Sequence, residues 1–98
     1  MPAYLVANIR VRDAAGFEEY RARVPAVIAA HGGRYLVRGG ALEVVEGAPA
    51  LARVVILEFP DMAALKGFYA SPEYAPLLRL RLETAESEVV LVEGHAPG

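Results

Sequence analysis

Apolar and polar residues alternate at the start of the chain, over residues 3–11. Successive side chains of a strand point to opposite faces of its sheet, so this alternation predicts a first β-strand. One face would carry Leu5, Ala7, Ile9 and Val11, and the other face Tyr4, Val6, Asn8 and Arg10. Because the second face is mixed rather than polar, we expect something other than water to cover it.

After Asp13 the apolar spacing changes to steps of three and four residues, which is the spacing of an amphipathic helix. Asp13 is a suitable N-cap, and the helix should span residues 14–30. Its apolar stripe consists of Phe17, Tyr20, Val24, Val27, Ile28 and His31. Pro25 has no amide to donate to the carbonyl of Arg21, so we expect a kink or local break inside one helix.

A glycine-flanked segment follows. Gly32 and Gly33 should end the helix, and residues 34–38 alternate as a second strand does. We expect Gly39 or Gly40 to adopt φ > 0 at a bulge or tight bend, after which the strand would resume over residues 42–46.

Residues 52–59 are apolar on both faces, which predicts a strand in the middle of a sheet. Pro60 ends this strand, and Asp61 can cap a short helix that carries Leu65, Phe68 and Tyr69. Ser71 and Pro72 interrupt the helical path and restart it as a second segment reaching about residue 83. The buried stripe of this segment would be Tyr74, Leu77, Leu78 and Leu82. Pro76 should shorten its beginning, and residues 87–93 form the last strand.

The predicted order is therefore βαββαβ, the ferredoxin-like arrangement of the α+β class. Right-handed crossovers would place the helices on one face of a four-stranded antiparallel sheet. We expect residues 1–94 to form a single domain and residues 95–98 a flexible tail. The bare, apolar second face of the sheet favours a homodimer that packs two sheets face to face, as in a dimeric α/β barrel.

Composition narrows the partners. Of 98 residues, 55% are hydrophobic and 22% charged, and the net charge is −2 with acidic and basic residues interspersed. A chain without a basic face is expected to have no nucleic-acid or membrane partner. The chain has no cysteine, which excludes thiolate chemistry and fits a cytoplasmic location. No histidine or carboxylate spacing supplies three metal ligands, so no metal is expected.

Several short stretches occur together: GGRYLVRGG at 32–40, EG at 46–47, EFP at 58–60, YASPEY at 69–74 and VVLVEG at 89–94. In combination they closely resemble the domain of unknown function 1330 family of the dimeric α/β-barrel superfamily. The resemblance spans residues 4–94 and implies a ferredoxin-like fold and a face-to-face dimer. The wider superfamily includes cofactor-free monooxygenases of polyketide-like aromatics, haem-degrading enzymes, isomerases and dehalogenases.

The resemblance also suggests catalytic residues. Asn8, Tyr69 and Tyr74 lie where the monooxygenase relatives keep an asparagine, an aromatic and a further polar residue. They could orient an aromatic or carbonyl ligand between sheet and helices. Alternatively, each tyrosine buries its ring and bonds its hydroxyl locally. Tyr74 stands where haem-degrading relatives keep a histidine ligand, so no haem or other cofactor is expected.

Three further residues are candidates for ligand binding. His31 could shuttle a proton near neutral pH, or simply complement the negative end of the first helix. Arg38 could hold an anionic ligand through a bidentate contact. Together with Glu46, near a strand end, Arg38 could instead form an ion pair that specifies the dimer.

Two classes of function remain open. The chain could bind a small organic ligand in a pocket between the sheet and the second helical segment, as a cofactor-free oxygenase or isomerase. It could instead be a non-catalytic dimeric binding or regulatory module. A deep pocket lined by Asn8, Arg38, Tyr69 and Tyr74 would favour the first class, and a filled interior would favour the second.

Overall fold

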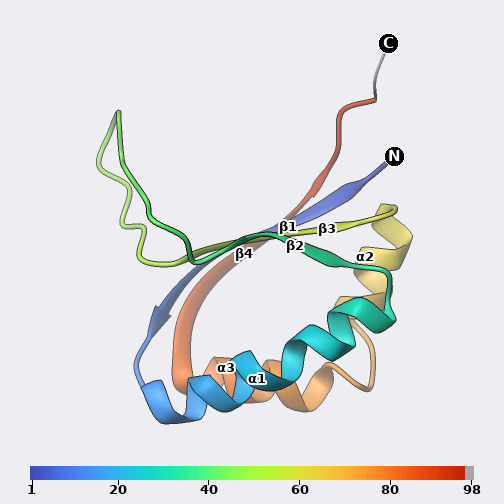
Figure 1. Cartoon of the computed structure of the whole chain (residues 1–98), viewed down its shortest axis with the longest axis horizontal. Coiled ribbons are helices and arrows are strands. Elements are labelled where there is room, and N and C mark those ends of the chain that lie inside the picture. Colours follow the sequence, from blue (N-terminus) through green and yellow to red (C-terminus); the bar gives the residue numbers. More distant parts are fainter. Residues whose placement is uncertain (97–98) are drawn as a thin grey trace.

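Three helices cover one face of a four-stranded antiparallel sheet in a computed structural model that describes residues 1–96 (Figure 1). The strand order across the sheet is β2-β3-β1-β4. In chain order the elements are β1 (Ala3–Val11), α1 (Ala14–Ala30), β2 (Arg34–Arg38), β3 (Val54–Phe59), α2 (Met62–Tyr69), α3 (Ala75–Thr84) and β4 (Ala85–Glu93). The predicted α+β, ferredoxin-like fold is confirmed. Flexibility of residues 95–96 stays a prediction, and the rest of the expected tail, 97–98, lies outside the described residues.

The hydrophobic core lies between the sheet and the helices. Ala3, Leu5, Ala7 and Ile9 of β1 face this layer, as the alternation predicted, whereas Val11 at the end of the strand is exposed. Leu57 and Phe59 of β3 join the core. Phe17, Val24 and Ile28 of α1 pack on them from the other side. The first helix has its predicted bounds and continues through Pro25, and its Asp13 cap accepts a hydrogen bond of 3.2 Å from the Gly16 amide. No helix in the described part of the chain is long and apolar enough to cross a membrane.

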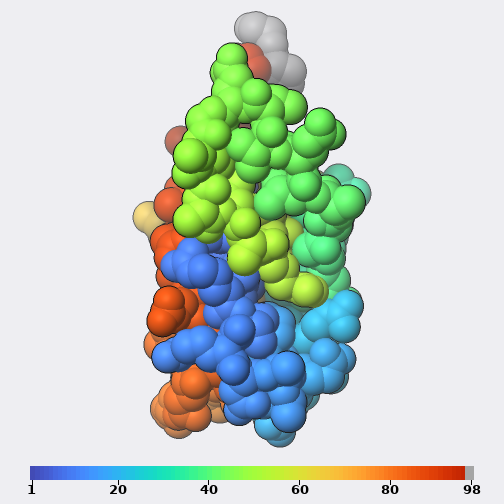
Figure 2. Space-filling model, turned by 90° about the vertical axis from the view of Figure 1, so that its left-hand side faces the viewer, coloured from blue at the N-terminus to red at the C-terminus, as the bar shows by residue number. Residues whose placement is uncertain are grey.

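The prediction of a bend in the second strand is wrong in two respects: where the bulge lies, and whether the strand resumes after it. Gly39 does adopt a positive φ, of 68°, but the bulge precedes it at Leu36, and β2 ends at Arg38. Residues 42–46 do not resume the strand. A strand there would have to pair with the segment just before β3, where Pro49 has no amide to donate. Residues 40–53 instead form a long loop that projects from the sheet (Figures 1 and 2).

The buried face of the second helical segment differs from the predicted stripe. Leu82 is 58% exposed, whereas Arg81 is only 3% exposed. The buried side follows the steps 74, 77, 81 and 84, so a charged residue occupies a position assigned to an apolar one. Pro76 lies in the first turn, and the helix begins at Ala75, as its position predicted.

The face of the sheet that turns away from the helices carries exposed apolar side chains, among them Val90 and Val92 of β4. The projecting loop adds four more: Leu42, Val44, Val45 and Leu51. Figure 2 shows this loop as the upper part of the molecule, apart from the helices. In residues 1–96 these apolar side chains are left exposed.

Candidate ligand-binding cavity

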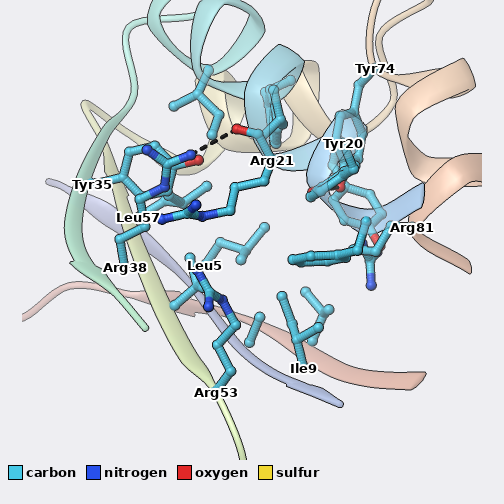
Figure 3. A pocket seen from close by; sticks show the side chains of 18 residues that line it. Leu5, Ile9, Tyr20, Arg21, Tyr35, Arg38, Arg53, Leu57, Tyr74 and Arg81 are labelled. Atoms are coloured by element: carbon cyan, nitrogen blue, oxygen red, sulfur yellow. Dashed lines mark hydrogen bonds between the residues drawn. The ribbon is translucent and has the colours of Figure 1, made fainter. Parts of the chain in front are cut away.

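A cavity opens between the sheet and the helices, inside the layer that forms the core (Figure 3). Its volume is about 50 Å³, and a larger space of about 550 Å³ is reached only when the open solvent at its mouth is included. Most of its wall is apolar and comes from the sheet, through residues such as Leu5, Ile9 and Leu57, and from α1 through Val24. The polar part of its lining consists of four tyrosines and four arginines. An apolar wall that carries a few polar groups is typical of small-molecule sites.

Tyrosines gather at one side of the cavity. The Tyr20 and Tyr74 hydroxyls are 2.9 Å apart, and the ring centroids of Tyr69 and Tyr74 are 5.5 Å apart. Tyr74 is 2% exposed. Burial, followed by the neighbouring Tyr74, raises the pKa of Tyr20 far above its ordinary value. The Tyr20 phenol therefore stays neutral at physiological pH and can donate or accept hydrogen bonds there.

Arg81 lies beside these tyrosines. One of its amino groups donates to the Tyr69 hydroxyl at 3.1 Å and the other to the Ser87 hydroxyl. No carboxylate of residues 1–96 forms an ion pair with this guanidinium. A buried cation that lacks an anion is unfavourable. Arg81 therefore gives this side of the cavity a positive charge that the described chain does not balance.

Three further arginines gather across the cavity from Tyr20, Tyr74 and Arg81 (Figure 3). Arg21 comes from α1, Arg38 from β2, and Arg53 from the position just before β3. The Arg38 guanidinium lies 4.6 Å above the centre of the Tyr35 ring. Arg21 approaches Glu18 at 3.4 Å, and its buried Nε has no hydrogen-bond partner. No ion pair of the described residues involves Arg38 or Arg53.

Pro25 explains why Arg38 is held at the cavity. In a regular helix the carbonyl of Arg21 would accept a hydrogen bond from the amide of residue 25, and proline has none. Arg38 donates to this carbonyl instead, at 2.7 Å (Figure 3). The proline in α1 thus creates an acceptor that fixes a side chain of β2.

The bulge in β2 turns Arg38 toward the cavity. Tyr35 pairs with Leu57, and Arg38 pairs with Val55. These two paired positions are three residues apart along β2 but only two apart along β3. In a regular strand, residues three apart point to opposite faces. The extra residue at Leu36 removes this difference, so both Tyr35 and Arg38 line the cavity.

Gly39 makes room for Arg53. A Cβ at this position would lie 2.8 Å from Cζ of Arg53, and the φ of 68° disfavours any other residue. Gly40, its neighbour, has open space around its Cα. The expectation of a positive φ thus holds at Gly39, where it allows an arginine to pack against the backbone.

The structure brings some of the predicted site residues together and separates others. Tyr69, Tyr74 and Arg38 line the cavity. Asn8 does not, and the expectation that it points in with them is wrong: it lies on the even-numbered face of β1, away from the helices. Its amide contacts the carbonyl of Ala50 at 3.1 Å and the amide of Ala52 at 2.8 Å. Asn8 therefore ties the projecting loop to the sheet.

His31 and Glu46 also lie outside the cavity lining. His31 caps the end of α1, with Nδ1 3.0 Å from the carbonyl of Val27 and its ring edge-on to Phe68. Glu46 lies in the exposed loop, because the strand expected to carry it does not form. Among the described residues no group of three histidine, cysteine, aspartate or glutamate side chains could hold a metal ion.

Sequence reasoning missed five polar lining residues, which are Tyr20, Arg21, Tyr35, Arg53 and Arg81. Arg81 had a readable signal, since it follows Tyr74 by seven residues and Leu77 by four, which places it on their helical face. Tyr20 belongs to the predicted apolar stripe of α1, which indicates a core position and not a polar one. Arg53 carried no signal, because its place depends on the loop that precedes β3.

The fold and cavity define a ferredoxin-like α+β domain with an internal pocket. A family model described as "Domain of unknown function (DUF1330)" matches residues 2–95, and the chain belongs to this family. None of the curated proteins compared with the chain matches it.

Solved structures share the fold at low sequence identity. A protein of unknown function from Rhodopseudomonas palustris is 20% identical, with a TM-score of 0.77 over 98% of this chain and 84% of that one. SnoaB, a cofactor-independent oxygenase from Streptomyces nogalater, is 20% identical, with a TM-score of 0.66 over 98% of this chain and 95% of that one. A dimeric ferredoxin-like protein of unknown function from Jannaschia sp. CCS1 is 16% identical, with a TM-score of 0.70 over 96% and 100%.

Proposed function

We propose that this protein binds a small organic molecule, bearing an aromatic or carbonyl group, in the cavity between its sheet and its helices. The observation that carries the proposal is the cavity itself, whose apolar wall of sheet and helix residues ends in tyrosine hydroxyls and guanidinium groups. The wall would hold the ligand's hydrocarbon part. Tyr69, Tyr74 and Arg81 would donate hydrogen bonds to a ligand oxygen.

A titration series tests this proposal. Phenols, quinols and short keto acids are screened by thermal shift, and binding is quantified by calorimetry for wild type, Tyr69→Phe and Tyr74→Phe. Each variant should weaken binding about five- to tenfold, since each removes one hydroxyl donor. Tyr4→Phe is the matched control, because Tyr4 lies on the opposite face of the sheet. Equal binding by wild type and both cavity variants would place the ligand elsewhere.

The working unit in this proposal is a homodimer with one cavity in each protomer. Val90, Val92 and the apolar side chains of the projecting loop need cover, and a second copy of the chain offers the same apolar surface. Light scattering should give twice the chain mass at micromolar concentration. Val90→Asp should dissociate the dimer, whereas Leu82→Asp, on the exposed side of α3, should not. A monomeric wild type would contradict the proposal.

Cofactor-independent oxygenation is the second candidate, and the buried Arg81 favours it. A guanidinium without a carboxylate partner can stabilise the oxyanion of an ionised phenol or enol. Such an anion can react with O₂ so that a CH₂ group and O₂ give a carbonyl and one water. The lining has no aspartate, glutamate, histidine, lysine or cysteine to serve as a base, so the substrate itself must be acidic.

An oxygen electrode separates this candidate from its alternatives. Uptake of one O₂ per acidic phenol consumed, lost in Arg81→Gln, would support an oxygenase. Recovery of a rearranged product without O₂ uptake would indicate an isomerase, in which the same anion is reprotonated at another carbon. Recovery of unchanged ligand would leave a non-catalytic binding or regulatory module.

A further inference from the structure

We infer that the ligand of this cavity is an organic carboxylate, and that Arg38 and Arg53, supported by Arg21, hold its carboxylate group. This inference rests on the proposed function, because it specifies the class of molecule that the cavity binds. It follows from the charge of the lining, from the way the arginines are held and from the hydrogen-bond donors they have left.

The charge of the lining is unbalanced. Four arginines line the cavity, and no aspartate or glutamate does. Among residues 1–96 the single carboxylate that pairs with any of them is Glu18, which approaches Arg21 from the solvent side, with 66% of its own side chain exposed. A cavity with several cations and no anion attracts a negatively charged ligand. Guanidinium groups pair with carboxylates through two parallel hydrogen bonds, which makes a carboxylate the matching group.

Arg38 and Arg53 are held in place before any ligand binds. The carbonyl released by Pro25 fixes Arg38, and the bulge at Leu36 turns it inward. Arg53 packs against the backbone of Gly39. Each of these features departs from regular helix or strand geometry, and all three act on the same two side chains. Prior ordering of the donors reduces the entropy that binding would otherwise cost.

Donors remain available at this side of the cavity. Arg38 uses one amino group for the carbonyl of Arg21, which leaves its other amino group and Nε. No side-chain hydrogen bond of the described residues involves Arg53, and the buried Nε of Arg21 has no partner. A carboxylate has two oxygens that can each accept more than one hydrogen bond, so it can satisfy several of these donors together.

The opposite side of the cavity indicates the chemistry of the rest of the ligand. Leu5 lies between Arg53 and the tyrosine side (Figure 3), and with Leu57 and Phe17 it belongs to the apolar lining, where a ring or short alkyl chain would fit. Tyr69 and Arg81 can then bind a second oxygen. The class that meets both ends is a phenolic or keto acid with a short spacer between its two polar groups.

Paired ligands test the inference by calorimetry. The probes are 3-(4-hydroxyphenyl)propanoate and its primary amide, which differ in charge and hardly in size. Wild type should bind the acid at least about tenfold more tightly than the amide. Arg38→Gln and Arg53→Gln should each weaken acid binding about tenfold and leave amide binding unchanged. Arg23→Gln is the matched control, because Arg23 pairs with Glu19 on the outer side of α1.

Each contrary result has a distinct meaning. Equal binding of acid and amide would overturn the carboxylate inference and leave the proposed function standing. Binding of neither probe, nor of any phenol or keto acid, would overturn both. Acid binding that Arg38→Gln and Arg53→Gln leave intact, together with a weakened dimer, would assign these arginines to the protein interface instead. Circular dichroism and melting temperature confirm that each variant is folded.

Discussion

Arginines on the two sides of the sheet differ in whether a carboxylate pairs with them. On the face turned away from the helices, Arg10 pairs with Glu88 and Arg34 pairs with Glu58, at 2.7 Å in the second pair. In the cavity on the other side of the sheet, Arg38, Arg53 and Arg81 have no carboxylate partner among residues 1–96, and Arg21 approaches only Glu18. The difference indicates that charge on the open face is balanced within the chain. In the proposed function, a bound ligand balances the charge in the cavity.

The largest expected effect concerns the glycine that makes room for Arg53. Gly39→Val should lower the free energy of unfolding by about 2–3 kcal/mol, because a β-branched residue is strained at positive φ and would collide with Arg53. Gly40→Val is the matched control, since that position is open. Urea denaturation measures both. Equal destabilisation by the two variants would contradict the special role of Gly39.

The next effect changes stability and ligand binding in opposite directions. Pro25→Ala should raise the free energy of unfolding by about 1–2 kcal/mol, since alanine restores the helical amide that proline lacks. The restored amide would compete with Arg38 for the carbonyl of Arg21, so binding of the hydroxyphenylpropanoate acid should weaken severalfold. A more stable variant with unchanged acid affinity would show that Arg38 needs no such anchor.

Smaller changes in stability, of opposite sign, are expected when an arginine is replaced in the cavity and on the open face of the sheet. Arg81→Met should raise the free energy of unfolding by about 1 kcal/mol, because it removes a buried charge that has no anion, while it weakens ligand binding. Arg34→Met on the open face should lower stability by less than about 1 kcal/mol. Chemical denaturation of both variants checks the signs. Loss of stability in Arg81→Met would mean that the chain already balances this charge.

The smallest effect is a pH dependence of protein stability that arises from Glu88, on the face of the sheet turned away from the helices. Hydrogen bonds from Arg10 and then Asn8 hold the pKa of Glu88 below its ordinary value of 4.5. A carboxylate with a lowered pKa stabilises the folded protein above the unfolded value, and this contribution is lost as pH falls through the folded value. Melting temperature should therefore fall more steeply below pH 4.5 in wild type than in Glu88→Gln. Parallel curves would contradict this linkage.

Much of the fold could be predicted because its signals are local. The alternation of β1 and the stripe of α1 each depend on neighbouring residues, and both were predicted with the bounds that the structure shows. The same alternation already separated Asn8 from Leu5 and Ile9, so its position away from the cavity was readable from the sequence. The resemblance to the monooxygenases implied the opposite, that Asn8 lies in the cavity.

The cavity could be predicted only in part, because its polar residues depend on irregular features. The bulge at Leu36 has no glycine to mark it, yet it decides where Arg38 points. The loop over residues 40–53 places Arg53, and its shape depends on contacts such as those of Asn8. The helical phase of α3 allowed either Arg81 or Leu82 inside, and apolar preference alone chose the wrong one.

The central claim is that the arginines of the cavity bind the carboxylate of a ligand. Its most direct test is a crystal structure of the protein with 3-(4-hydroxyphenyl)propanoate. We predict one molecule in each cavity, with its carboxylate within hydrogen-bond distance of Arg38 and Arg53 and its phenol near Tyr69 and Arg81. A cavity filled only by the protein's own side chains, with Arg38 and Arg53 paired to carboxylates of a second copy of the chain, would contradict the central claim.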